Sequence, residues 1–187
     1  MDGCKSFLAR KNIVISAKRY GIDALGAMAQ GLFCSLLIGT IIKTLGQQLG
    51  LPFLVDIGGY AGPAMAAAIG YALQAPPLVL FSLIAVGSAA NGLGGAGGPL
   101  AVLVIAILAA EVGKAVSKET KVDILVTPLV TICVGVALSA WWAPAIGAAA
   151  SAFGQLIQDA TVLQPFWMGI VVSVLVGVAL TLPISSA

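Results

Sequence analysis

Residues Gly58-Gly59-Tyr60-Ala61-Gly62-Pro63 and Gly94-Gly95-Ala96-Gly97-Gly98-Pro99 follow one pattern: a cluster of glycines that ends in Gly-Pro and precedes a long apolar run. Glycine adopts backbone angles that other residues avoid, and proline is favourable in the first turn of a helix. Each copy therefore predicts an irregular turn that begins a helix. We refer to the two stretches as the first and second glycine phrases.

The composition around these phrases is that of a membrane protein. Of 187 residues, 60% are hydrophobic and 9% are charged, whereas soluble domains contain about a quarter charged residues. The apolar residues form long runs, as bilayer-spanning helices of about 20 residues require. We expect an integral membrane protein with one transmembrane domain, residues 21–187, after an N-terminal interfacial amphipathic segment, residues 1–20.

The positive charges are confined to two regions, which predicts how the chain lies in the membrane. Eight of nine basic residues are Lys5, Arg10, Lys11, Lys18, Arg19, Lys114, Lys118 and Lys121. Basic loops of membrane proteins face the cytoplasm, so both regions are expected there, with a cytoplasmic N-terminus in a bacterial inner membrane. The membrane orientation accounts for both basic regions, so we expect no nucleic-acid partner.

The apolar runs predict an all-α, polytopic bundle of about six spans. The expected spans are Ala24 to Leu45, Ile57 to Leu73, Pro77 to Ala90, Pro99 to Val112, Ile124 to Trp142 (ended by Pro144), and Val162 to Leu182. Several contain a small residue at every fourth position, which favours close helix packing. The second and third spans are short and joined by Pro76-Pro77, so a re-entrant hairpin is the alternative for that pair.

Residues suited to catalysis are scarce. The chain contains no histidine, which removes the usual neutral-pH proton shuttle and His-metal clusters. Neither glycine phrase is followed by the lysine of a phosphate-binding loop. We expect no enzymatic activity, no metal site and no cofactor.

The glycine phrases are the predicted substrate-binding region. Where a membrane helix begins inside a protein, its unpaired amide hydrogens and positive dipole end can hold a polar solute. The candidate residues are Asp56, Gly58, Gly59, Tyr60, Asn91, Gly94 and Gly95. The alternative is that these glycines only permit close packing in tight loops.

Three stretches carry a family resemblance. Asp56 to Pro63, Asn91 to Pro99 and Thr127-Pro128-Leu129-Val130-Thr131 resemble a family of bacterial phosphotransferase-system IIC-like sugar permeases, some of them named as regulators of perfringolysin expression. The resemblance covers nearly the whole chain, which looks like the N-terminal part of longer members. It implies a polytopic permease that forms a homodimer and passes sugar to a cytoplasmic phosphotransferase partner.

The expected function is that of a transporter for a small polar solute, with sugar as the class that the resemblance implies. One alternative is a membrane-embedded ligand sensor or regulatory protein with the same pocket. Another is a structural subunit of a larger membrane assembly.

Overall fold

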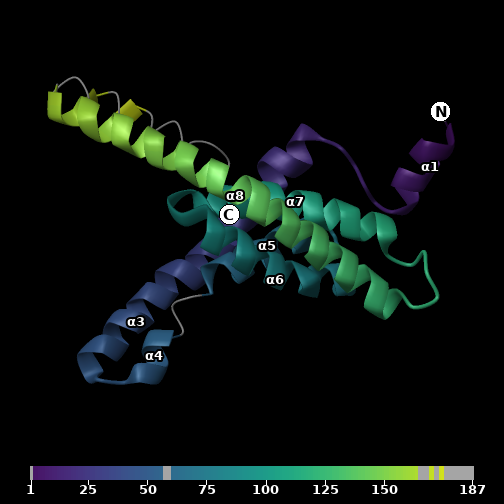
Figure 1. Ribbon diagram of the computed structural model, residues 1–187, viewed down its shortest axis with the longest axis horizontal. Coiled ribbons are helices and arrows are strands. Elements are labelled where there is room, and N and C mark those ends of the chain that lie inside the picture. The colour runs from purple at the N-terminus through teal and green to yellow at the C-terminus, as the bar shows by residue number, and fades with distance from the viewer. Residues whose placement is uncertain (1, 57–59, 164–168, 171–172, 175–187) are drawn as a thin grey trace.

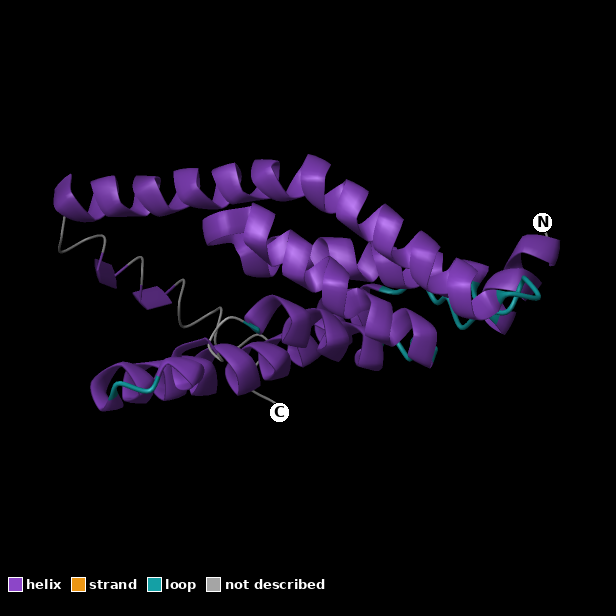
Figure 2. Ribbon diagram, turned by 60° about the horizontal axis from the view of Figure 1, so that its bottom comes forward, coloured by secondary structure: helices purple, strands orange, loops and turns teal. Residues whose placement is uncertain are grey.

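The structure is a computed structural model that describes residues 2–56, 60–163, 169–170 and 173–174 (Figure 1). Figure 2 shows helices joined by short loops, and the described residues contain no strand, which confirms the all-α class. The elements in order are α1 (Asp2–Arg10), η1 (Lys18–Asp23), α2 (Ala24–Leu32), η2 (Phe33–Leu37), α3 (Ile38–Leu49), α4 (Pro52–Asp56), α5 (Ala61–Ala72), α6 (Pro77–Gly94), η4 (Gly95–Gly97), α7 (Gly98–Val116) and α8 (Asp123–Leu163).

Three segments of the described chain are long and apolar enough to cross a membrane: Lys18–Leu49, Pro77–Val116 and Asp123–Ala152. The second contains two helices, because the chain reverses at η4. Gly113 near the end of α7 packs against Val79 near the start of α6, so the two helices are antiparallel. The described residues do not confirm six spans, and most of the predicted last span lies outside them.

Four predicted span ends come too early. The first and fourth spans were expected to end at Leu45 and Val112, but α3 continues to Leu49 and α7 to Val116. The third span was expected to end at Ala90, but α6 continues through Asn91 to Gly94. The fifth span was expected to stop at Pro144, but α8 continues through this proline to Leu163. Proline removes one helical hydrogen bond, yet membrane helices tolerate it where neighbouring groups satisfy the freed carbonyl.

Helix α5 is too short to cross a bilayer unaided. Its 12 residues correspond to about 18 Å at 1.5 Å per residue, against a hydrocarbon core about 30 Å thick. It starts beside Gly87 and Asn91 of α6, because Gly62 packs against both residues. The helix that follows the first glycine phrase therefore starts beside an interior turn of α6, not beside the C-terminal end of α6.

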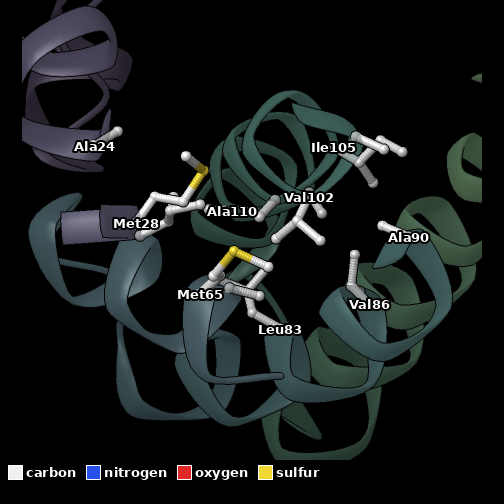
Figure 3. Packing of buried hydrophobic residues seen from close by; sticks show 14 of the residues in the cluster. Ala24, Met28, Met65, Leu83, Val86, Ala90, Val102, Ile105 and Ala110 are labelled. Carbon is white, nitrogen blue, oxygen red and sulfur yellow. The ribbon is translucent and has the colours of Figure 1, made fainter. Parts of the chain in front are cut away.

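Helix α6 lies at the centre of the bundle and packs on α5, α7 and α8, while α2 covers α5. Figure 3 shows the small and aliphatic side chains of this core converging between the helices. The fully buried core members include Met65, Leu83, Val86, Ala90, Val102, Ile105 and Ala110. Outside this core, α3, α4 and the C-terminal part of α8 extend away from the bundle (Figures 1 and 2).

Glycines at the helix crossings allow backbones to approach closely. A Cβ atom added to Gly31 would lie 2.8 Å from the Ala64 carbonyl oxygen, and one added to Gly70 would lie 2.6 Å from Leu83 Cδ1. Gly31 has no room for a side chain because the contact is with backbone, whereas at Gly70 the Leu83 side chain would have to move. Small residues are common where membrane helices pack, and the prediction of a tightly packed bundle is confirmed.

The N-terminal segment, the α5–α6 turn and the α7–α8 loop meet at one end of the bundle. Lys11 Nζ lies 2.6 Å from Glu119 Oε1, and Asn12 Nδ2 donates a 2.7 Å hydrogen bond to Gln74 Oε1. Lys114 Nζ donates to the Asn12 carbonyl at 3.2 Å. Both basic regions therefore lie at the same end, which we term the N-terminal end. That segment 1–20 lies on a membrane surface stays a prediction.

Candidate functional site at the glycine-rich junction

The two glycine phrases meet at Asn91. A Cβ atom on Gly62 would lie 2.6 Å from Asn91 Cβ, and one on Gly98 would lie 2.5 Å from Asn91 Oδ1 and 2.9 Å from the Asn91 carbonyl oxygen. Gly62 belongs to the first phrase and Gly98 to the second, so a single side chain of α6 lies between them. We call Gly62, Asn91 and Gly98 the glycine-rich junction.

Two helices begin at this junction without a capping side chain. Tyr60 is the N-cap residue of α5 and Gly97 that of α7, and neither helix start has a side-chain cap hydrogen bond. The first amides of a helix lack intrahelical acceptors, and the helix dipole places positive partial charge there. The Asn91 side chain adds two amide hydrogens and a carbonyl oxygen. The junction thus offers both donors and an acceptor.

The second phrase also has a packing role. A Cβ atom on Gly97 would lie 2.9 Å from the Ile146 carbonyl oxygen and 3.0 Å from Ala150 Cβ of α8. Gly95 has a φ of 50°, a left-handed conformation that favours glycine, and it turns the chain from α6 into α7. Gly95 and Gly97 are therefore explained by the tight turn and by close packing on α8, and neither role involves Asn91.

The predicted site residues have different surroundings. Asp56 is the last residue of α4, and its side chain lies outside the described part of the structure, as do Gly58 and Gly59. Tyr60 is 62% exposed. Asn91 is half-buried, Gly94 is buried and Gly95 is exposed. The structure brings Asn91 to both glycine phrases; it does not show how Asp56 lies relative to it.

The junction is uncharged within the described residues. All ion pairs among them join Arg10 or Lys11 to Glu119, or Lys114 to Glu111, at the N-terminal end. No group of three or more potential metal-ligating side chains occurs in the part of the chain that the structure describes. Amide and backbone groups in an apolar bundle suit a neutral polar ligand better than an ion, because an unpaired charge is costly to bury there.

The sequence did not predict the polar cluster at the N-terminal end. Glu111 and Lys114, one turn apart on α7, form an ion pair at 2.9 Å. Asn12 and Gln74, however, are 62 positions apart, and their pairing depends on how α1 and α5 end. The only sequence signal for it was Pro76-Pro77, which fixes the turn after Gln74.

The comparisons with known proteins identify the family. A family model described as "Phosphotransferase system, EIIC" matches residues 22–187. The search of curated proteins and the search of solved structures gave no match. The matched range contains both glycine phrases, the junction, and helices α5 to α8 in full. The chain therefore belongs to the phosphotransferase-system EIIC family of membrane transport components.

Proposed function

We propose that this chain is a permease for a small, neutral polar solute of the sugar class, and that the glycine-rich junction forms part of its binding site. The observation that carries the proposal is the position of Asn91 between the uncapped starts of α5 and α7. Discontinuous helices with such ends hold substrates near the midplane of transporters. The EIIC family membership supports sugar as the solute class.

The chemistry of the junction matches hydroxyl groups. A sugar hydroxyl both donates and accepts hydrogen bonds, and the Asn91 amide can pair with it in both directions. Backbone amides at the first turn of α5 supply further donors, whereas at the start of α7 the Gly98 amide already donates to the Gly95 carbonyl. Exposed Tyr60 at the start of α5 offers an aromatic face for a sugar ring, and Asp56 is the proposed carboxylate acceptor.

We assign the N-terminal end of the bundle to the cytoplasm. The positive-inside rule favours this side, because a pocket there is lined by Lys11, Lys114 and Lys118. Lys43 instead lies on α3, which extends away from the bundle (Figure 1). The solute would then enter from the side of η4. We also propose that the chain forms a homodimer, as the family implies. The phosphotransferase partner would bind at the N-terminal end, because that end is the proposed cytoplasmic side.

A thermal-stability screen of the purified protein in detergent tests ligand binding. We expect one of glucose, galactose, mannitol, N-acetylglucosamine or cellobiose to raise the unfolding temperature, because a ligand that binds only the folded state stabilises it, by about 2.7 kcal/mol at a hundredfold excess over Kd. Asn91→Ala should lose this effect. Ser88→Ala, at an exposed position one turn earlier on α6, is the control and should keep it. A folded sample that none of these sugars stabilises would contradict the proposal.

Asp56→Asn tests the second member of the site. The substitution keeps the side-chain size and removes the charged acceptor, so the sugar-dependent rise in unfolding temperature should be lost while the unliganded protein unfolds as before. If the variant responds to sugar as the wild type does, Asp56 is not part of the site.

A further inference from the structure

A second, chemically different pocket lies at the N-terminal end of the bundle. It has a volume of about 400 Å³, within the range of small-molecule sites. Four cationic side chains line it, together with one carboxylate, that of Glu119. Its cations and amides come from three separate segments: Arg10, Lys11, Asn12, Gln74, Lys114 and Lys118. We call it the basic pocket.

Part of this positive charge has a structural explanation. Lys114 Nζ donates to the Leu73 carbonyl oxygen at 3.2 Å, and Lys11 Nζ donates to the carbonyl of Ser117. Both oxygens lie at helix C-termini, where the helix dipole places negative partial charge. Lys114 also pairs with Glu111, and Lys11 with Glu119. These two lysines are therefore neutralised by the protein itself.

The other two cations are not matched in this way. Arg10 is 68% exposed, and its nearest carboxylate oxygen, on Glu119, is 3.6 Å away and already bound by Lys11. Its guanidinium carbon lies 5.5 Å from the centre of the Phe7 ring, which supports the group at the pocket. The Lys118 ammonium forms no ion pair with a described carboxylate. Asp123 Oδ1 accepts a 2.7 Å hydrogen bond from the Lys118 backbone amide, and this carboxylate also interacts with the Lys118 charge. The pocket therefore keeps an excess of positive charge, with Arg10 its least compensated cation.

Unusual backbone angles converge on the same place. Asn12, Gln74 and Lys118 have φ values of 54°, 53° and 63°, and they are the only non-glycine residues with positive φ in the described chain. This conformation is unfavourable for L-residues other than glycine, asparagine and aspartate. All three line the basic pocket. At Asn12 and Gln74 this conformation ends a helix, because the Ile13 amide donates to the Leu8 carbonyl and the Ala75 amide to the Gly70 carbonyl, a common way for helices to end. The three left-handed residues thus show that three chain reversals meet at the pocket.

We propose that the basic pocket binds a phosphate group, an inference that is independent of the sugar site. Arg10 offers a planar fork of donors that matches phosphate oxygens, and Lys118 offers a second cation. Gln74 accepts from Asn12 through Oε1, which leaves its amide hydrogens as further donors. The phosphate comes from one of two sources: a soluble phosphate monoester, or the headgroup of an anionic phospholipid at the membrane surface.

Calorimetric titration with inorganic phosphate tests the site in nanodiscs of zwitterionic phosphatidylcholine. Lys118→Asn removes the charge and keeps a residue that tolerates the left-handed conformation. We expect it to weaken phosphate binding by at least about tenfold, as loss of a charged hydrogen bond does, and Arg10→Gln to do the same. Lys121→Asn, an equal change of charge in the same loop but outside the pocket, should leave the Kd unchanged.

A second arm identifies the source. If a phospholipid headgroup occupies the pocket, adding phosphatidylglycerol to the nanodiscs will abolish phosphate binding, and native mass spectrometry will show retained phosphatidylglycerol that Lys118→Asn loses. If the ligand is a soluble monoester, phosphatidylglycerol will leave the phosphate Kd unchanged. The proposal is overturned if the wild type neither binds phosphate nor retains phosphatidylglycerol over phosphatidylcholine. It is also overturned if Lys121→Asn weakens binding as much as Lys118→Asn.

Discussion

At the scale of single residues, the bundle depends on glycines that leave no room for a side chain. Gly87 of α6 and Gly62 of α5 face each other, and a Cβ atom at Gly87 would lie 2.5 Å from Ala66 Cβ as well as against the Gly62 carbonyl. Gly92, five residues later in α6, has nothing within 4 Å of its Cβ position. The same substitution should therefore have opposite effects at the two positions.

We expect Gly87→Ala to destabilise the protein by about 1–3 kcal/mol, the usual cost of forcing extra atoms into a packed core. Gly92→Ala should instead be neutral or stabilising, because alanine has a higher helix propensity than glycine. Thermal unfolding in detergent measures both changes. Equal unfolding temperatures for the two variants would contradict the close α5–α6 crossing.

Lys114 is a second residue on which stability depends. Its side chain is 1% exposed and pairs with Glu111, which is 15% exposed. Lys114→Met removes the ion-pair partner of this half-buried carboxylate, so we expect a loss of stability of up to about 3–5 kcal/mol, the cost of breaking a fully buried pair. The double variant Glu111→Leu/Lys114→Met should recover part of this stability, since no buried charge remains. A double variant less stable than Lys114→Met would show that Glu111 is not the partner that matters.

At the scale of elements, the N-terminal segment is attached to the α7–α8 loop by Lys11 and Glu119. The hydrogen bond from Lys11, together with its charge, holds the pKa of the Glu119 carboxyl below its usual value. A carboxylate with a lowered folded-state pKa stabilises the fold above its unfolded pKa, about 4.3, and this contribution is lost as the pH falls through the lower folded value. The attachment should therefore persist at neutral pH and weaken in acid.

Hydrogen exchange of the amides of residues 12–17 measures this attachment. Protection factors, which correct for the slower intrinsic exchange in acid, should be lower in Glu119→Gln at neutral pH, and should fall in the wild type only when the pH drops below about 4.3. Thr120→Ala, at the adjacent exposed position, is the control and should change nothing. Identical exchange in Glu119→Gln and wild type would show that other contacts hold the segment.

The starts of helices were more predictable than their ends. Pro99 follows a glycine cluster and correctly indicated a helix that begins there, since α7 starts at Gly98. Pro144 did not end α8, because a proline within a membrane helix is tolerated or not according to the groups that surround it. That information lies in tertiary structure rather than in the local sequence.

At the scale of the whole molecule, the charge distribution predicted that both basic regions share one side, and the contacts of Lys11 with Ser117 and Glu119 bring them together. The position of Asn91 between the two phrases was beyond prediction. It depends on where α5 crosses α6, at Gly62 and Gly87. Each helix has several small residues at which the other could cross, so the sequence of one helix does not determine the crossing point.

Single cysteines in a background without the native ones test the proposed orientation. Thr120→Cys lies in the exposed α7–α8 loop and Ala96→Cys at the exposed η4 turn. A membrane-impermeant maleimide should label position 120 only from the cytoplasmic side and position 96 only from the opposite side. Labelling of both positions from one side would contradict the proposal that α7 crosses the membrane.

Counterflow in reconstituted vesicles tests the central claim most directly. Vesicles loaded with the unlabelled sugar that best stabilises the protein are diluted into trace radiolabelled sugar. We predict transient accumulation of label with wild type and Ser88→Ala, and none with Asn91→Ala. Label entry no faster than into protein-free vesicles would contradict the account. If the protein still bound sugar, this result would favour the membrane-embedded sensor. If it did not bind sugar, the result would favour a structural subunit.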